Sequence, residues 1–269
     1  MHIRSFPHRG LLSLAALALL LGGCSTVPET GRQQVRLIDA EQETQLGLTE
    51  FQKLKTNTPI SKDRTQQALL NGVGQNIARV APLPNAQWEF VLFEEPENPN
   101  AFCLPGGKVG VYSGILPITQ NEAGLATVIG HEVAHAVARH GAERVSHGLL
   151  IQTGGQALEV VLGGSTQTTR TLALGAYGIG SQLGVALPYS RTQELEADHL
   201  GLLYMARAGY DPREAVAFWK RFSAYQVKRG GGSSVEFLST HPLDATRIRQ
   251  LEQLLPKATR EYERYQAGR

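Results

Sequence analysis

The chain has 269 residues, of which 42% are hydrophobic and 19% are charged. This length supports one substantial domain with its own core, and this composition excludes an intrinsically disordered chain. Lysine and arginine number 26 and aspartate and glutamate 24, but the first 23 residues contain two arginines and no acidic residue. The remaining chain is therefore balanced in charge, and we expect no nucleic-acid partner.

The N-terminus has the pattern of a bacterial lipoprotein signal. Arg4 and Arg9 precede an apolar run over residues 11–21, which is too short for a stable membrane anchor, and the run ends in Leu-Gly-Gly-Cys. This ending resembles a lipobox, so we predict that residues 1–23 are cleaved and that Cys24 becomes the acylated N-terminus. Ser25, in place of aspartate, favours the outer membrane of a bacterial envelope, with the protein facing the periplasm. The alternative is an ordinary signal peptide with an incidental cysteine.

The first part of the remaining chain predicts a polar tether over residues 25–38 and a helix over 39–55, so that residues 24–60 form a tether and a helix. A second helix is expected over residues 61–80, with Ser61 as a plausible N-cap. Residues 61–269 would then form the main domain.

A small sheet is expected next. Residues 88–93 are rich in aromatic and β-branched side chains and predict a strand. Pro-Gly-Gly at residues 105–107 is a strong turn signal between two short apolar runs, so residues 98–112 predict a hairpin. A helix is expected over residues 122–140.

Cys103 has no partner within the chain if Cys24 carries a lipid. Its apolar surroundings predict a buried small hydrophobic side chain. A thiolate that blocks the metal described below and a disulfide to another protein are the alternatives.

Residues 145–187 are apolar, rich in glycine and poor in charge. We predict two helices of roughly 17 residues that are separated by a break at residues 163–165. One interpretation is a pair of close-packed core helices, and the other is a mobile or membrane-touching flap over the active site.

The C-terminal third predicts three more helices. They are expected over residues 191–206, from an Asp-Pro-Arg-Glu start at residues 211–214 to about residue 227, and from Thr-His-Pro at residues 240–242 to about residue 255. A glycine-rich loop over residues 228–234 separates the last two. The sequence shows no internal repeat, so no repeat domain is expected.

A metal-binding motif lies in the helix predicted over residues 122–140. His131 and His135 are four residues apart, which places them about 40° apart on one helix face, so both imidazoles can bind one Zn²⁺ ion. Glu132 is rotated away from the ligands and can act as a general base on a water at the metal. The pattern His-Glu-x-x-His predicts a metallopeptidase with one zinc ion per chain.

A third protein ligand is required. His140 is excluded because, on a continuous helix, it points about 180° away from His131. A metzincin would need a histidine at the position of Gly141, so that class is disfavoured. Glu194 and Asp198 share one face of a second helix, and we assign Glu194 as the ligand and Asp198 as the acceptor of a hydrogen bond from a ligand histidine.

Four ordered blocks of residues resemble the gluzincin peptidases of the HtpX, BepA and LoiP type over most of the chain. The blocks are Asn-Ala-Phe at residues 100–102 with Pro-Gly-Gly at 105–107, His-Glu-Val-Ala-His at 131–135, Ser-Arg at 190–191 with Glu-Leu-Glu-Ala-Asp at 194–198, and His-Pro at 241–242 with Arg-Ile at 247–248. The resemblance is strongest to the short lipoprotein members, because transmembrane helices and a repeat domain are lacking. It implies an α+β, mostly α-helical, zincin-like fold with a small β-sheet.

The resemblance also implies a strand near residues 100–104 that pairs with peptide substrate, with Asn100, Ala101 and Phe102 as substrate-binding residues. His241 has three interpretations: it stabilises the oxyanion of the tetrahedral intermediate, it occupies the open zinc position and keeps the enzyme idle, or it caps a helix.

The function expected from these features is a lipid-anchored zinc endopeptidase that cleaves misfolded or misassembled envelope proteins, with envelope assembly machinery as a potential partner. An assembly factor or chaperone with a latent zinc site and a zinc hydrolase of non-peptide substrates are the alternatives.

Overall fold

The computed structural model describes residues 24–182, 186–229, 241–242 and 245–268. The predicted signal peptide, residue 240 and most of the predicted glycine-rich loop lie outside these residues. The described elements, in chain order, are β1 (Cys24–Thr26), β2 (Gln33–Val35), α2 (Ala40–Asn57), α3 (Arg64–Val80), β3 (Glu89–Phe93), β4 (Ala101–Leu104), β5 (Lys108–Tyr112), η1 (Ser113–Ile115), α4 (Leu116–Thr119), α5 (Glu122–Val137), α6 (His140–Val161), η2 (Leu162–Gly164), α7 (Gln167–Ser181), α8 (Leu187–Arg207), α9 (Arg213–Lys228) and α11 (Ala245–Ala267). The expected class, mostly helical with a small sheet, is confirmed.

The segment expected to be a tether is instead folded onto the body. Strands β1 and β2 pair antiparallel, with Cys24 opposite Val35, and Val27 in the turn between them is buried in the main core. After β2, the amide of Leu37 donates a hydrogen bond of 2.8 Å to Ser146 Oγ on α6. The prediction of a tether over residues 25–38 was wrong because this hairpin (residues 24–35, the N-terminal hairpin) gains apolar burial and specific polar contacts.

The three-stranded sheet has the order β3-β5-β4, with β3 parallel and β4 antiparallel to β5. The predicted strand at residues 88–93 and the predicted hairpin are confirmed. Gly106 and Gly107 form the hairpin turn with φ angles of 84° and 81°, a conformation that favours glycine. Strand β4 ends the strand order of this sheet.

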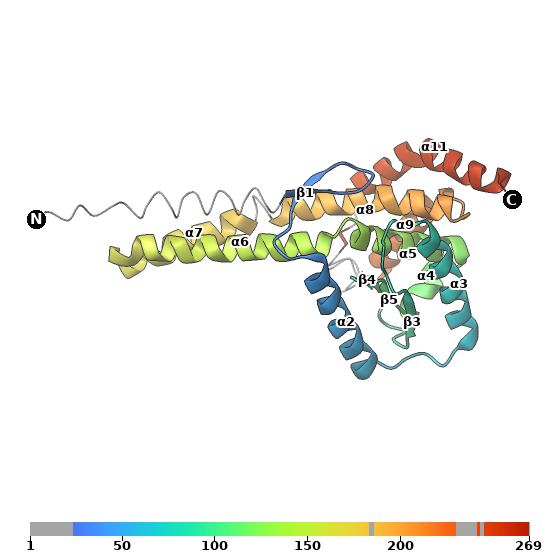
Figure 1. The fold of residues 1–269 in the computed structure, drawn as a ribbon, viewed down its shortest axis with the longest axis horizontal. Coiled ribbons are helices and arrows are strands. Elements are labelled where there is room, and N and C mark those ends of the chain that lie inside the picture. The colour runs from blue at the N-terminus through green and yellow to red at the C-terminus, as the bar shows by residue number, and fades with distance from the viewer. Residues whose placement is uncertain (1–23, 183–185, 230–240, 243–244, 269) are drawn as a thin grey trace, which may run out of the picture.

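Helices cover both faces of this sheet. One face packs an aromatic cluster against α2, in which Phe51 contacts Phe102, and Phe102 contacts Phe93. The opposite face contributes to the main core with α3, α5, α8 and α9. Helix α5 runs through the centre of the body, between the sheet and α8 (Figure 1).

The start of α3 and the end of α5 differ from the prediction. Asp63, not Ser61, caps α3, because its carboxylate accepts hydrogen bonds from the amides of Thr65 and Gln66. The helix expected over residues 122–140 ends at Val137, because Arg139 adopts a left-handed conformation with φ of 56° and the chain restarts as α6 at His140. The Arg139 side chain is paired there with Glu43 of α2.

Helices α6 and α7 form an arm that projects from the body (Figure 1). The predicted break is confirmed, since η2 and the residues after it separate the two helices. The interpretation as close-packed core helices was wrong: among the described residues of α7 none is buried, and Val160 and Val161 at the tip are 81% and 79% exposed. A mobile or membrane-touching flap stays a prediction.

Helices α8 and α9 both pack on α5, and α11 packs on α8 and α9. Helix α8 begins at Leu187, four residues earlier than expected, and α11 runs to Ala267, beyond Pro256 and well past the predicted end. Ala258 in this extension is fully buried, which explains why the helix continues. Within the described residues, no helix is both long enough and apolar enough to cross a bilayer.

Candidate metal centre

Helix α5 positions the two histidines of the motif. Asn121 caps the helix by accepting a hydrogen bond of 2.8 Å from the amide of Gly124, and every residue from Gly124 to Val137 is buried. His131 and His135 face one another across one helical turn, with 3.2 Å between their Nε2 atoms. The motif therefore lies on a rigid, fully packed helix.

Helix α8 brings Glu194 to the same point. Its carboxylate lies 3.3 Å from His131 Nε2 and 3.3 Å from His135 Nε2. The two helices approach closely at Gly130 and Gly201: a Cβ on Gly201 would lie 2.8 Å from the backbone nitrogen of His131. Glycine at this crossing therefore sets the distance between the carboxylate and the imidazoles.

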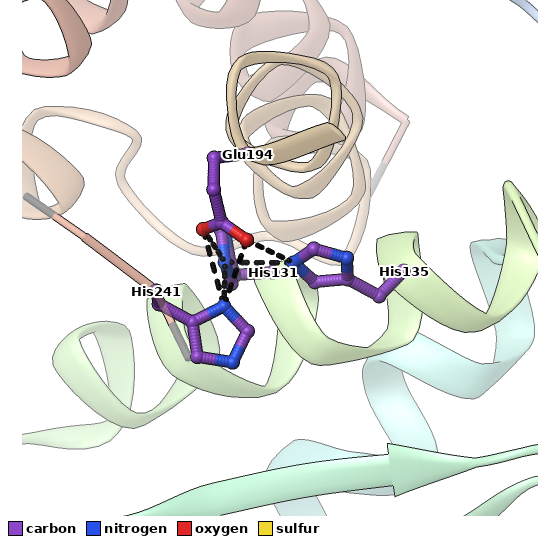
Figure 2. Close-up of side chains that lie close together, drawn as sticks. All are labelled: His131, His135, Glu194 and His241. Carbon is purple, nitrogen blue, oxygen red and sulfur yellow. Dashed lines mark hydrogen bonds and ion pairs between the residues drawn. The ribbon is translucent and has the colours of Figure 1, made fainter. Parts of the chain in front are cut away.

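His241 completes the group from the segment before α11. Its Nδ1 atom lies 3.1 Å from both carboxylate oxygens of Glu194 and 3.3 Å from His131 Nε2. Figure 2 shows the four side chains pointing toward one another from α5, α8 and this segment. All four are buried, and their ligand atoms lie within 4.8 Å of one another.

The spacing of these donors fits zinc. A tetrahedral ion with bonds of about 2.0–2.1 Å places its ligand atoms about 3.3 Å apart. Five of the six residue pairs have donor atoms 3.1 to 3.3 Å apart, counting either carboxylate oxygen of Glu194, and all four donors lie within 4.8 Å of one another. Three imidazoles and one carboxylate are ligands that zinc accepts, so the donor set and its spacing both suit this ion.

Asp198 lies one turn after Glu194 and supports the first histidine. Its Oδ1 atom is 3.0 Å from His131 Nδ1, on the side of the ring opposite the ligand atom. Arg247 of α11 donates two hydrogen bonds of 2.7 Å to this carboxylate. A proton on His131 Nδ1 is thereby favoured, which leaves Nε2 free to bind metal.

Two carboxylates of the site, Glu194 and Asp198, are held ionised by their partners, and Glu132 is not. Burial alone raises the pKa of Glu194, but His135 and the hydrogen bonds from the other histidines hold it well below its usual range. Burial likewise opposes ionisation of Asp198, and Arg247 outweighs it and lowers the pKa of that group. Burial raises the pKa of Glu132, which suits a group that must accept a proton near neutral pH.

Glu132 lies beside the cluster and is not one of its four members. One of its carboxylate oxygens is 3.5 Å from His241 Nε2. The structure thus places His241 between the metal-facing donors and the expected general base. The ring of His241 faces the cluster, and the three interpretations of this residue stay predictions.

His140 lies outside the donor group, as does Glu196, the acidic residue between the two assigned carboxylates. His140 Nδ1 is 2.7 Å from His135 Nδ1, and His140 Nε2 is 2.9 Å from Glu196 Oε2. The expected reason for excluding His140, a continuous helix, was wrong, because the break at Arg139 returns this ring to the back of His135.

The residues expected to bind substrate lie on or beside β4. Ala101 and Phe102 belong to the strand, and Asn100 precedes it and accepts a hydrogen bond from the amide of Tyr112 through its carbonyl oxygen. Phe102 packs over Gly110 and into the aromatic cluster against α2. Cys103 on the same strand is only partly buried, and burial of its thiol raises its pKa.

Arg247 is the site residue whose role sequence reasoning did not find. It is 2% exposed, lies 3.1 Å from Glu194, and stacks 4.2 Å above the ring of Trp219. It also donates hydrogen bonds to the carbonyl oxygens of His241 and Pro242. Arg247 belongs to the fourth block of the resemblance, and this was the one sequence feature that pointed to a role in the site. Its neighbours in sequence do not distinguish it from a surface arginine on an amphipathic helix.

Comparison of the sequence with known proteins finds a matching family and several relatives. The sequence profile of "Peptidase family M48" matches residues 64–255, which include every residue of the donor group. The mitochondrial metalloendopeptidase OMA1 of Saccharomyces cerevisiae is 40% identical over 184 residues, covering 67% of this chain and 51% of that protein.

Two further relatives cover more of the chain. The human metalloendopeptidase OMA1 is 31% identical over 241 residues (86% of this chain, 46% of that protein). The beta-barrel assembly-enhancing protease of Escherichia coli is 26% identical over 226 residues (83% of this chain, 46% of that protein). The chain spans about half the length of the curated relatives it matches.

Proposed function

Because the chain belongs to peptidase family M48, we propose that it is a zinc-dependent endopeptidase. The observation that supports this most directly is the donor group of His131, His135 and Glu194, whose atoms stand 3.2–3.3 Å apart on two helices packed at Gly130 and Gly201. A zinc ion bound there would lower the pKa of a coordinated water and polarise a peptide carbonyl.

The side chains around this donor group divide the remaining work. Glu132 accepts the proton from the attacking water and passes it to the leaving amine, in keeping with its raised pKa and its position beside the cluster. Asp198 keeps His131 in the tautomer that binds metal. Arg247 holds Asp198 and Glu194 in place through its buried guanidinium.

Substrate would bind as an added strand along β4. This strand ends the strand order β3-β5-β4 and packs against α5, so its backbone is near the donor group. Main-chain pairing with Asn100, Ala101 and Phe102 would then select extended, unfolded segments with little dependence on their side chains. Such selection suits a peptidase that removes misfolded proteins.

We further infer that the arrangement around His241 is a resting state. With His131, His135 and Glu194 as ligands, the Nδ1 atom of His241 stands where a fourth ligand belongs. Substrate hydrolysis needs that position for water, so His241 must withdraw before the reaction. The contact between His241 and Glu132 supports the same conclusion, since it occupies the general base.

The cellular role is proposed from the N-terminus and one relative. Lipidation of Cys24 would attach the protein to the outer membrane facing the periplasm, where misfolded or misassembled proteins would be its substrates. The Escherichia coli relative is named a beta-barrel assembly-enhancing protease, which supports a role in protein assembly. Mass spectrometry of the membrane-extracted protein would show an acylated Cys24, and Cys24→Ala would release it. An assembly factor that retains a latent zinc site is the competing proposal.

Four proteins separate these possibilities: the wild type, Glu132→Gln, His241→Ala and the double variant. Zinc content and casein cleavage are measured on each. We expect zinc in all of them and loss of at least about a hundredfold in cleavage by Glu132→Gln, since general-base catalysis contributes about 10²–10⁴-fold. Zinc absent from the folded wild type would overturn the proposed metal centre.

The His241→Ala variant distinguishes the two roles of that histidine. Cleavage should rise if His241 blocks the fourth position, and fall if it stabilises the transition state. An unchanged rate contradicts both. Equal cleavage by the His241→Ala protein and its Glu132→Gln double variant would show that a contaminating peptidase is responsible. An assembly factor would instead keep its cellular role in the Glu132→Gln background.

A further inference from the structure

The back of the second zinc-binding histidine is connected to the N-terminal hairpin through buried polar groups. His135 Nδ1 faces His140 Nδ1 at 2.7 Å, and His140 Nε2 faces Glu196 Oε2 at 2.9 Å. Arg32, between the two strands of the hairpin, donates from Nε to that same Glu196 oxygen at 2.8 Å. These four residues form an unbroken chain of contacts that we call the His140 relay.

Arg32 is fixed at its end of the relay by a second carboxylate. Its two terminal nitrogens donate to Glu143 at 2.7 and 2.9 Å in a bidentate pair. Glu143 is fully buried and accepts a further hydrogen bond of 2.7 Å from Gln193. Thr30, also in the hairpin turn, donates to Glu196. The hairpin thus supplies two donor side chains to this buried acidic pair, and Arg32 forms an ion pair with both carboxylates.

The proton positions along the relay leave no free choice. When His135 binds a metal through Nε2, its single proton must sit on Nδ1, where it donates to His140 Nδ1. His140 must then present a lone pair at Nδ1 and carry its own proton on Nε2, which donates to the Glu196 carboxylate. The same assignment follows from the Arg32 end. The ionised Glu196 carboxylate can only accept, so it accepts from both Arg32 and His140 Nε2, and a neutral His140 is then left with a lone pair at Nδ1 for the His135 proton.

The two zinc-binding histidines are therefore supported by different devices. His131 contacts a carboxylate directly, through Asp198 at 3.0 Å. His135 reaches its carboxylate, Glu196, only through one more imidazole. That additional ring is available because α5 breaks at Arg139, which turns His140 back toward His135 instead of away from it.

We propose that His140 is a positioning residue that fixes the metal-binding tautomer of His135, and that Arg32 of the N-terminal hairpin keeps His140 and Glu196 in place for this task. The inference rests on the zinc site proposed above. It predicts that zinc affinity depends on docking of a segment that begins at Cys24, the proposed lipid attachment point, eight residues before Arg32 (32 − 24).

The test measures the zinc dissociation constant by competition with a chromogenic chelator, on the full chain and without any substrate. His140→Leu should bind zinc about 10- to 100-fold more weakly, the usual cost of losing a partner behind a metal ligand. His140→Asn should recover most of this loss, because its amide oxygen can accept the His135 proton where Nδ1 did. A role in packing alone predicts the reverse order, since leucine fills the site better.

Arg32→Gln tests the hairpin end, with Glu29→Gln as its matched control. Glu29 lies in the same hairpin turn and pairs with Arg207 at 2.7 Å, and none of its contacts with described residues reaches His140. We expect weaker zinc binding by Arg32→Gln and unchanged binding by Glu29→Gln. The absorption spectrum of the Co²⁺-loaded protein should change in the first variant and not in the second.

Each outcome decides between the inference and its rivals. A His140→Leu protein that binds zinc within twofold of wild type would overturn the relay, as would equal weakening by Glu29→Gln and Arg32→Gln. If His140→Leu does not fold, the zinc dissociation constants of His140→Asn and Arg32→Gln still test the relay. Weaker binding by Arg32→Gln than by His140→Asn supports it, and unchanged binding by Arg32→Gln overturns it. A wild-type chain that folds and binds no zinc would instead overturn the proposed function.

Discussion

Arg247 is the residue whose removal should damage the site most without touching a metal ligand. It is 2% exposed, and it donates two hydrogen bonds of 2.7 Å to Asp198 while lying 3.1 Å from Glu194. Substitution by methionine keeps a side chain of similar length that can still pack on Trp219. What Arg247→Met removes is therefore the positive charge between two buried carboxylates.

The size of the loss follows from that burial. Removing one partner of a buried ion pair costs about 3–5 kcal/mol, because the other charge stays desolvated. Loss of the cation–π contact with Trp219 at 4.2 Å adds to this cost. For a domain of this size 1 kcal/mol corresponds to about 2–4 °C in Tm, so the metal-free variant should melt roughly 6–20 °C lower.

Thermal and urea unfolding of chelator-treated protein, followed by circular dichroism, provide the measurement. Arg249→Met is the matched control, because Arg249 is exposed on the same helix and contacts only Thr246 among the described hydrogen bonds. The difference in the free energy of unfolding between Arg247→Met and wild type should narrow as pH falls from 7 to 5. Without Arg247, the two buried carboxylates take up protons more readily, and a neutral carboxyl group costs less to bury. A loss below 1 kcal/mol at pH 7, or an equal loss in Arg249→Met, would refute the reasoning.

Two more predictions concern the crossing of α5 and α8 at Gly201 and the buried carboxylate of Glu196, which pairs with Arg32. Gly201→Ala should push α8 away from α5, because its Cβ would lie 2.8 Å from the backbone of Gly130 and His131. We expect a loss of about 1–3 kcal/mol in the free energy of unfolding and weaker zinc binding. Gly148→Ala is the control and should not destabilise the protein, because its Cβ meets nothing within 4 Å. Burial raises the pKa of Glu196, but hydrogen bonds from His140, Thr30 and Arg32 lower it to about 2. Its carboxylate therefore stabilises the fold fully above its ordinary pKa of 4.5, and up to about 3 kcal/mol is lost as pH falls from 4.5 toward 2. Urea titrations should show this acid limb flattened in Glu196→Gln, and an identical acid limb would contradict the assignment.

Features that depend on short sequence separations were predictable from the residues alone. The spacing of His131 and His135 needs only a helix to bring the rings together, and the same holds for Glu194 and Asp198. The turn at Gly106 and Gly107 needs only the freedom of glycine at positive φ. In each case the local backbone geometry settles the arrangement before any tertiary contact forms.

Other features were decided only by tertiary packing. The N-terminal hairpin looks polar and unstructured in sequence, yet Arg32 folds it onto Glu143 and Glu196, residues that are 111 and 164 positions away. Helix α5 has no proline at its end, and the left-handed turn at Arg139 reflects its pairing with Glu43 on α2. Such contacts join segments whose separation no local pattern records.

The sequence by itself determined the metal-binding helix, the second acidic helix and the small sheet, because helix and strand periodicity place side chains on defined faces. Only the tertiary structure decided what stands behind and in front of the donors. Arg247 and His140 take their roles from helices that meet at the site. The arm of α6 and α7 is exposed because, among the described elements, α7 packs mainly against α6. An apolar sequence states that burial is favourable, but only the fold determines which surface is available to provide it.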